Sequence, residues 1–148
     1  MQPQNFSNHA RLVTGYHKVL TAIIGVTLIL AFYNLGYNLT ANYGNTQLLI
    51  NAILFALLSV ALLVTAFYAR AFALKAQDRV IILEESERHQ RLANAPLPTQ
   101  LKPSQIIALR FASDSEFVQL CQKAAQEGLK SKQIKAAIQH WKADYYRV

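Results

Sequence analysis

Two long runs of apolar residues without a charge dominate the first half of the chain. The first, VLTAIIGVTLILAFYNL, extends from Val19 to Leu35, and the second, LLINAILFALLSVALLVTAFYA, extends from Leu48 to Ala69. As helices they would measure about 25 Å and about 33 Å, close to the hydrocarbon thickness of a bilayer. A buried core helix would repeat polar residues on one face, but residues 53–64 contain only Ser59. The pattern therefore predicts two transmembrane helices.

The helical pattern continues beyond the second run into charged sequence. The stretch LLVTAFYARAFALKAQDRVIILEESERHQRLANAP, residues 62–96, contains no Gly, and its first Pro is Pro96. We therefore predict one helix from Leu48 to about Ala93. Its polar half places Glu84 with Arg88, and Glu87 with Arg91, at i,i+4 spacing, which is typical of a solvated face.

Small and apolar residues recur at alternating spacings of four and three between Leu62 and Leu83, forming a heptad seam. In lipid, helices associate where small side chains allow their backbones to approach closely. The seam therefore predicts close helix packing, either within the hairpin or between chains. The predicted packing residues are Ala52, Ala56, Ser59, Ala66, Ala69, Ala73, Ala76, Val80 and Leu83.

The last third of the chain has the signals of a small helical module. The preceding segment NAPLPTQLKP contains three prolines and predicts a linker. A first helix is predicted from Ser104 to about Ala112. A second begins at a capping box formed by Ser113 and Glu116 and closes at Gly128. A third is predicted to be capped by Ser131 and to carry an apolar stripe of Ile134, Ala137, Ile138 and Trp141.

The predicted fold class is thus an all-α membrane protein: a two-helix transmembrane hairpin, an extension of its second helix into the cytoplasm, and a small C-terminal helical module. The predicted segments are an N-terminal cytoplasmic segment 1–18, membrane helices 19–36 and 48–69 around a periplasmic loop 37–47, a helical continuation 70–93, a linker 94–103 and a three-helix module 104–148.

The distribution of basic residues predicts the orientation of the hairpin. The chain has 15 Lys and Arg against 8 Asp and Glu. Arg11 and Lys18 precede the first run and Arg70, Lys75 and Arg79 follow the second, whereas the loop between the runs has no charge. By the positive-inside rule we predict that both termini are cytoplasmic. No small-x-small site closes the first run, so we expect an uncleaved anchor rather than a signal peptide.

Basic residues next to the membrane and in the module predict contact with anionic headgroups. A basic third helix after a short turn also resembles a helix-turn-helix. Only Gln133 and Gln139 have base-reading side chains in this helix, which argues against nucleic-acid binding. The residues predicted to contact an anionic surface are Arg70, Lys75, Arg79, Lys130, Lys132 and Lys135.

The sequence offers no set of residues that converges for catalysis or for a metal. The four histidines are His9, His17, His89 and His140, and the second apolar run contains none of them, which argues against a haem held between the two spans. Glu85 and His89 share a helical face, as two metal ligands would, but a solvated ion-pair face accounts for them more simply. We therefore expect no catalytic residues, no cofactor and no metal.

Cys121 is the only cysteine. It lies on the apolar stripe of the second predicted short helix, and His140 follows it without a third residue to orient a catalytic pair. A core thiol in a reduced compartment is therefore predicted, rather than a nucleophile. Neither apolar run contains a charged residue, which argues against a pump or transporter acting alone.

Four segments, QNFSNHARLVTGYH, ARAFALKAQDRVIILEE, IIALRFASD and IKAAIQHWKADYYRV, resemble a family of small bacterial inner-membrane proteins of unknown function. The resemblance covers nearly the whole chain. It implies two spans and a helical cytoplasmic tail, and it supplies no activity or catalytic residues.

We expect a non-enzymatic integral inner-membrane interaction or scaffold protein. It would contact membrane lipid and either self-associate as a homo-oligomer or act as an accessory subunit of a larger membrane-protein complex. The alternative is a membrane tether whose basic module binds anionic lipid or nucleic acid.

Overall fold

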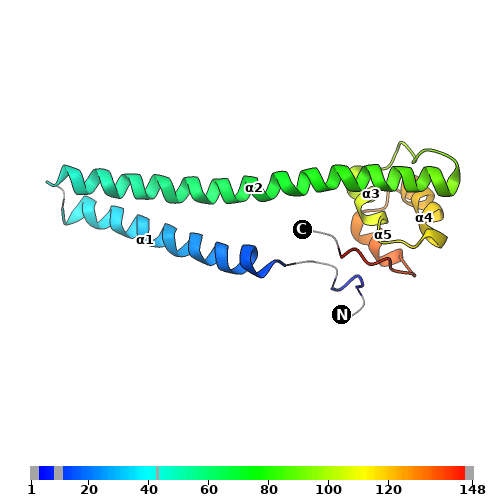
Figure 1. Ribbon diagram of the computed structural model, residues 1–148, viewed down its shortest axis with the longest axis horizontal. Helices are drawn as coiled ribbons and strands as arrows, with labels where there is room; N and C mark the ends of the chain where they lie inside the picture. Colours follow the sequence, from blue (N-terminus) through cyan, green and yellow to red (C-terminus); the bar gives the residue numbers. More distant parts are fainter. Residues whose placement is uncertain (1–3, 9–11, 43, 146–148) are drawn as a thin grey trace. The chain divides into compact units, whose positions relative to one another are not determined.

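A computed structural model describes residues 4–8, 12–42 and 44–145, and all of the regular elements in these ranges are helices (Figure 1). The predicted all-α class is confirmed for this part of the chain. The elements in order are a π-helix η1 (Gly15–Leu20), α1 (Thr21–Thr40), α2 (Thr46–Ala93), α3 (Pro103–Leu109), α4 (Asp114–Glu127) and α5 (Ser131–Ala137).

The chain divides into two compact units, and α2 runs through both. The first unit is Leu12–Phe72. The second contains the described residues that precede Leu12 and those from Ala73 onward. Helix α2 ends at Ala93 as the sequence predicts, because Asn94 adopts a positive φ of 51° and prolines follow.

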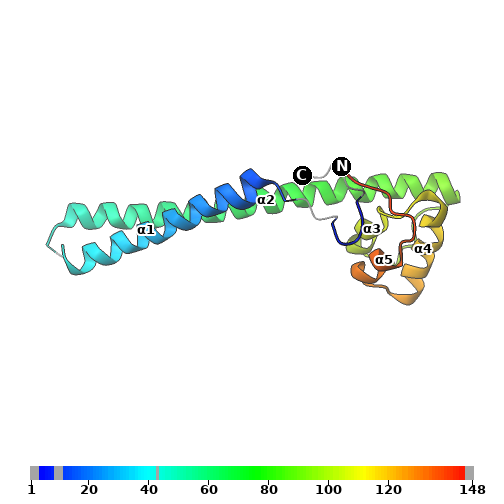
Figure 2. The ribbon, with the colours of Figure 1, turned by 90° about the horizontal axis from the view of Figure 1, so that it is seen from below.

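In the first unit, η1 leads directly into α1, so the first helical stretch is longer at both ends than the predicted span of 19–36. Figures 1 and 2 show α1 beside the first half of α2. Between them, Asn45 acts as an N-cap for α2, with its side-chain oxygen accepting a hydrogen bond from the Leu48 backbone N–H at 3.2 Å.

Small residues on α2 make the contact between the two helices of this unit. Ala52, Ala56 and Ser59 are buried, as are Ile24 and Ala31 on α1. The Ser59 hydroxyl donates to the Ala56 carbonyl at 2.8 Å, so its polar group is satisfied inside its own helix. Close approach of the backbones is what such small residues permit.

Most of the apolar surface of these two helices faces outward. Only 11% of the most apolar window of the first helix and 17% of that of the second are buried. Ile29, Leu57 and Phe67 are each more than half exposed. Both helices are long and apolar enough to span a membrane.

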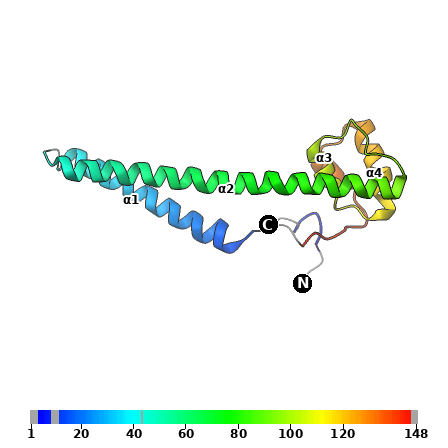
Figure 3. The same cartoon turned by 45° about the horizontal axis from the view of Figure 1, so that its top comes forward.

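In the second unit, α3, α4 and α5 lie beside the end of α2 (Figure 1), and α3 and α4 can also be followed there in Figure 3. Helix α3 begins with Pro103 at its first position, where a missing N–H costs nothing. Helix α4 begins at the predicted capping box, in which the Glu116 carboxylate accepts from the Ser113 N–H at 3.4 Å. It closes at Gly128, whose φ of 62° is left-handed and suits glycine.

Two predictions for the third short helix are wrong. Its N-cap is Lys130 rather than Ser131, whose hydroxyl instead donates to the Ser104 carbonyl at 2.8 Å. The helix ends at Ala137, and Ile138 is already extended. Trp141 therefore does not continue a helical stripe, and forms an isolated antiparallel bridge with Ala112.

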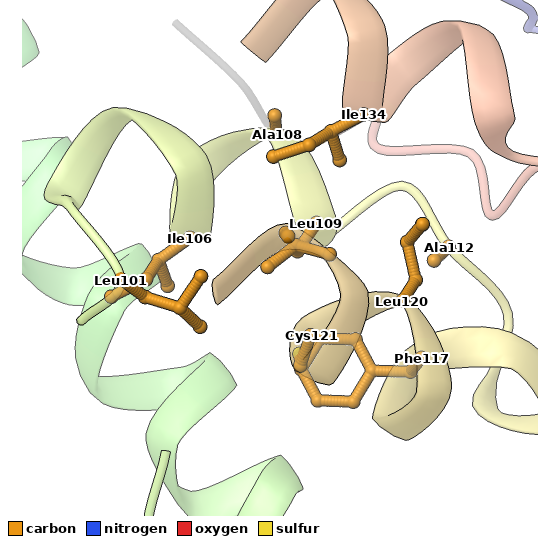
Figure 4. Close-up of a cluster of buried hydrophobic side chains, with 10 residues drawn as sticks. Leu101, Ile106, Ala108, Leu109, Ala112, Phe117, Leu120, Cys121 and Ile134 are labelled. Atoms are coloured by element: carbon orange, nitrogen blue, oxygen red, sulfur yellow. The ribbon is translucent and has the colours of Figure 1, made fainter. Parts of the chain in front are cut away.

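The core of the second unit is built from all three short helices (Figure 4). Leu109 of α3, Phe117 and Cys121 of α4, and Ile134 of α5 are fully buried in it. Ile82 of α2 packs against the same cluster, so the long helix is part of this core. A module this small has little core of its own, so the contact with Ile82 adds to its apolar burial.

Candidate functional site

The centre of the second unit is a buried arginine on α2 that joins the long helix to the module. Arg88 is 5% exposed. Its guanidinium donates to Glu85 at 2.9 Å, to the Asp114 carboxylate at 2.7 Å and to the Ala112 carbonyl at 2.7 Å. It also lies over the Phe117 ring, 4.2 Å from the centroid. One side chain thus connects α2, the α3–α4 turn and the core.

This arrangement corrects the predicted solvated face of α2. Arg88 pairs with Glu85 at i,i+3 rather than with Glu84, because its face of the helix packs against the module. Glu85 and His89, proposed as a solvated ion-pair face, are 6% and 4% exposed. The Ile81 and Ile82 pair one turn before them is the signal in the sequence that marks this face as buried.

Asp114 holds its charge through the arginine. The hydrogen bond from Arg88, aided by the positive charge of that guanidinium, lowers the pKa of Asp114 from its ordinary value of 3.8, against a smaller opposing effect of burial. Asp114 is also the first residue of α4, where a negative charge favours the positive end of the helix dipole. The same carboxylate therefore anchors Arg88 and stabilises α4.

His89 and Cys121 lie in the buried surroundings of Arg88. The His89 Nδ1 atom is 2.7 Å from the Ala95 carbonyl, which ties the end of α2 to the start of the linker. Burial raises the pKa of the Cys121 thiol to about 12, and the nearby Glu85 adds to this rise. A thiol in this state is protonated and suited to packing rather than to nucleophilic attack.

The segment after α5 is held on the module by Glu116. Its carboxylate accepts backbone hydrogen bonds from Gln139 at 3.0 Å and from His140 at 2.9 Å. Burial raises the pKa of Glu116, but these N–H donors outweigh it and lower the pKa from its ordinary value of 4.5. The predicted capping residue thus has a second role, which the local sequence pattern does not reveal.

Beyond this anchor, the segment presents an aromatic stack. The Trp141 ring stacks on Phe111 with centroids 4.6 Å apart. Arg110 lies over the same phenylalanine at 4.4 Å and Lys135 at 5.3 Å. Arg110 also forms an ion pair with Asp144 at 3.1 Å. The Trp141–Phe111 stack and the Arg110–Asp144 ion pair hold the C-terminal segment on the module, and the two cations pack on the same Phe111 ring.

A cavity of about 560 Å³ lies between α2 and residues 142–145. Glu84, Glu85 and Asp144 line it together with Arg110 and Lys142. Both signs of charge are present, so the lining favours no single class of charged ligand.

The whole chain, residues 1–148, matches the group described as Family of unknown function (DUF6526). The chain belongs to this family. The predicted membership of a family of unknown function is therefore confirmed over its full length. No curated protein and no solved structure matches the chain.

The structure separates the predicted packing residues of this DUF6526 chain into two groups. Ala52, Ala56 and Ser59 are buried and Ala66 is half-buried, the last with its carbonyl accepting a hydrogen bond from the Tyr16 hydroxyl at 2.5 Å. The remaining members are exposed: Ala69, Ala73, Ala76, Val80 and Leu83.

The predicted basic contacts also differ in their surroundings. Lys75, Arg79, Lys130 and Lys132 are exposed. Arg70 is half-buried over the Tyr16 ring at 5.9 Å, and Lys135 is half-buried over Phe111.

The other candidate residues do not assemble into a reactive centre in the described ranges. His17 belongs to the first unit, and His140 is exposed in the second. His9 lies outside the described residues. Within 4–8, 12–42 and 44–145, no three His, Cys, Asp or Glu side chains are grouped as metal ligands.

Proposed function

We propose that this protein is an integral inner-membrane scaffold: a two-helix hairpin anchors it, and α2 holds the α3–α5 module in the cytoplasm for binding to other proteins. One observation carries the proposal. Helix α2 is unbroken from Thr46 to Ala93, apolar and outward-facing in its first half, and bound through buried Arg88 to a folded module in its second.

The exposed apolar residues support membrane anchoring. Large side chains such as Ile29, Leu57 and Phe67 face outward around the first unit, where water would impose a large hydrophobic penalty. Lipid removes that penalty. The absence of charge between Val19 and Leu35 and between Leu48 and Ala69 has the same explanation.

The basic residues at the ends of the apolar runs support the orientation. Lys18 precedes α1, and Arg70, Lys75 and Arg79 follow the apolar part of α2, while residues 36–47 carry no charge. With the hairpin inserted in a bacterial inner membrane, both termini and the module lie in the cytoplasm.

The buried Arg88–Glu85 ion pair supports a scaffold role. A buried salt bridge adds little net stability compared with apolar packing, but it penalises every arrangement that leaves a charge unpaired. The buried guanidinium of Arg88, already paired with Glu85 on α2, therefore favours the one position of the module that supplies the Ala112 carbonyl and the Asp114 carboxylate as further acceptors. A module held in one position presents a constant surface to a partner, in self-association or as an accessory subunit of a larger complex.

The exposed lysines favour anionic lipid as a second ligand. Lys75 and Arg79 are exposed on α2, and Lys130 and Lys132 are exposed at the start of α5. Each basic side chain near an anionic surface contributes about 1 kcal/mol. Lys135 contributes less to such contact because it already lies over Phe111.

The proposal is tested by isolating the full chain from membranes in mild detergent and recording its mass and the proteins that copurify. We expect assemblies larger than the monomer. Arg88→Ala should remain in the membrane fraction and lose partners that bind the module, whereas Arg91→Ala, which changes an exposed arginine three residues further on, should keep them. A wild-type chain that is extracted by alkaline carbonate, or that is always a bare monomer, would contradict the proposal.

A further inference from the structure

We propose that the exposed face of α2 formed by Ala73, Ala76, Val80 and Leu83 binds the same face of a second copy of this chain in a parallel two-stranded coiled coil. We call these four residues the α2 seam. The proposal rests on the membrane anchoring above and adds to it the identity of one partner.

The α2 seam is exposed although the module is docked on the same helix: Leu83 lies opposite the module, and Val80 lies at the edge of the cavity between α2 and residues 142–145. Ile81, which faces the module, is 6% exposed. Leu83 follows two residues later, about 200° around the helix axis, and is 61% exposed. Val80 is 54% exposed. Because all four seam residues are exposed with the module in place, a second chain can reach them while the module stays bound.

The spacing and residue types of the seam match a parallel dimer. The spacings of three, four and three place Ala73 and Val80 at a positions and Ala76 and Leu83 at d positions of two heptads. A β-branched residue at a with leucine at d favours two strands. Two copies anchored in one bilayer with the same orientation necessarily have parallel α2 helices.

Charges beside the seam are complementary in this arrangement. Arg79 occupies the g position before Val80, and Glu84 occupies the e position after Leu83, five residues further on. In a parallel coiled coil, the residue at a g position of one chain pairs with the residue at the e position of the next heptad in the other chain. Arg79 therefore meets Glu84 of the partner subunit, and the symmetry of the dimer makes the pair twice. Both side chains are exposed in the single chain.

Anchoring compensates for the short length of the seam. Two heptads are too few for a stable coiled coil in solution. Confining both chains to one membrane with a common orientation raises their effective concentration, as a linker does between two binding modules.

The test is oxidative cross-linking of the full chain in native membranes, with Cys121→Ala as the background. Ala76→Cys places a thiol at a d position, and Lys75→Cys places one on an exposed neighbour off the seam. We expect a disulfide-linked homodimer from Ala76→Cys and little from Lys75→Cys. In the Ala76→Cys chain, Arg79→Glu should weaken association about fivefold through two like-charge pairs, and adding Glu84→Arg should restore it.

Each other outcome overturns the dimer or its proposed charge pairing. Equal cross-linking from both positions would mean random collision, and no rescue by the double charge exchange would remove the Arg79–Glu84 pairing. Cross-links only to other proteins would mean that a different partner covers the seam. Alkaline carbonate extraction of the same samples separates these failures from a failure of anchoring, because a chain that stays in the pellet without dimerising retains the proposed scaffold role.

Discussion

At the scale of single residues, Arg88 determines how the module is attached. Its guanidinium has three hydrogen-bond acceptors, and one of them, Glu85, is itself buried with 7% of its side chain exposed. Removing the arginine leaves that carboxylate without its cation in a medium of low dielectric constant. The loss in free energy of unfolding then comes mainly from the buried Glu85 carboxylate, which has lost its cation.

Arg88→Ala should therefore destabilise the second unit by about 3–5 kcal/mol. Two native probes report on it: Trp141, the only tryptophan, stacks on Phe111, and the Cys121 thiol is buried with a pKa of about 12. We expect a changed Trp141 emission and much faster alkylation of Cys121 in the variant.

A double variant separates the ion pair from simple loss of packing. Glu85→Ala with Arg88→Ala removes both charges and should be less destabilised than Arg88→Ala alone. Arg91→Ala changes an exposed position on the same helix, and in this variant Cys121 should be alkylated at the wild-type rate. Slow Cys121 alkylation in Arg88→Ala would mean that the arginine does not hold the module on α2.

Acid should loosen the second unit through Asp114 and Glu116. Both pKa values are lowered in the folded chain, from ordinary values of 3.8 and 4.5. A lowered pKa contributes stability in full above the ordinary value, and that stability is lost as the pH falls toward the folded value. The melting temperature followed by Trp141 fluorescence should therefore drop most steeply below pH 4.5.

Substitution of Glu116 isolates its share of the acid effect. Glu116→Gln should melt below the wild type at neutral pH, because the Gln139 and His140 amides lose a charged acceptor. The two melting temperatures should converge in acid, since the wild-type carboxylate is then protonated. Glu127→Gln, at an exposed site, is the control. A constant difference between Glu116→Gln and wild type at every pH would exclude the carboxylate charge as the cause.

At the scale of elements, local signals define the helices of the module. Gly128 ends α4 with a φ of 62°, and a Cβ there would meet no atom within 4 Å. Gly128→Ala should consequently destabilise the module by about 1 kcal/mol through backbone strain alone. Gly36→Ala, inside α1 with equally open surroundings, should not lower its stability. The effect of Gly128→Ala is measured by chemical denaturation followed by Trp141 fluorescence. The effect of Gly36→Ala is measured as helix content by circular dichroism.

The elements that follow from short-range patterns are the ones that the sequence predicts well. The end of α2 at Ala93 and the start of α4 at Ser113 rest on prolines and a capping box, which act within a few residues. The third short helix is predicted too long because its apolar spacing continues to Trp141. In the structure, the long-range pairing of Trp141 with Ala112 and Phe111 replaces the last helical turn.

The contacts of Arg88 with the module could not be predicted either, because they too join residues far apart in the sequence. Glu84 lies four residues before Arg88 in the sequence, whereas the hydrogen bond from Arg88 to Asp114 spans 26 residues. A local pattern cannot distinguish a buried arginine from a solvated one. The isoleucines at 81 and 82 indicate a buried face, but they do not identify its partner.

At the scale of the whole molecule, the scaffold proposal requires the loop between α1 and α2 to lie across the membrane from the linker after α2. Membrane topology is set by charge at the ends of the spans, whereas the packing inside each unit is set by side-chain contacts. Labelling from outside the cell therefore tests the topology without depending on how the units pack.

Two single-cysteine chains in a Cys121→Ala background make this test. Gly44→Cys lies in the loop and Gln100→Cys in the linker, and both positions are exposed. A membrane-impermeant maleimide should label Gly44→Cys in intact cells and label Gln100→Cys only after lysis, because residues 36–47 carry no charge and basic residues follow α2's apolar half. The reverse pattern would place the module outside the cytoplasm. Equal labelling of both positions in intact cells would mean that the two apolar helices do not separate loop from linker, and the scaffold would then lack its anchor.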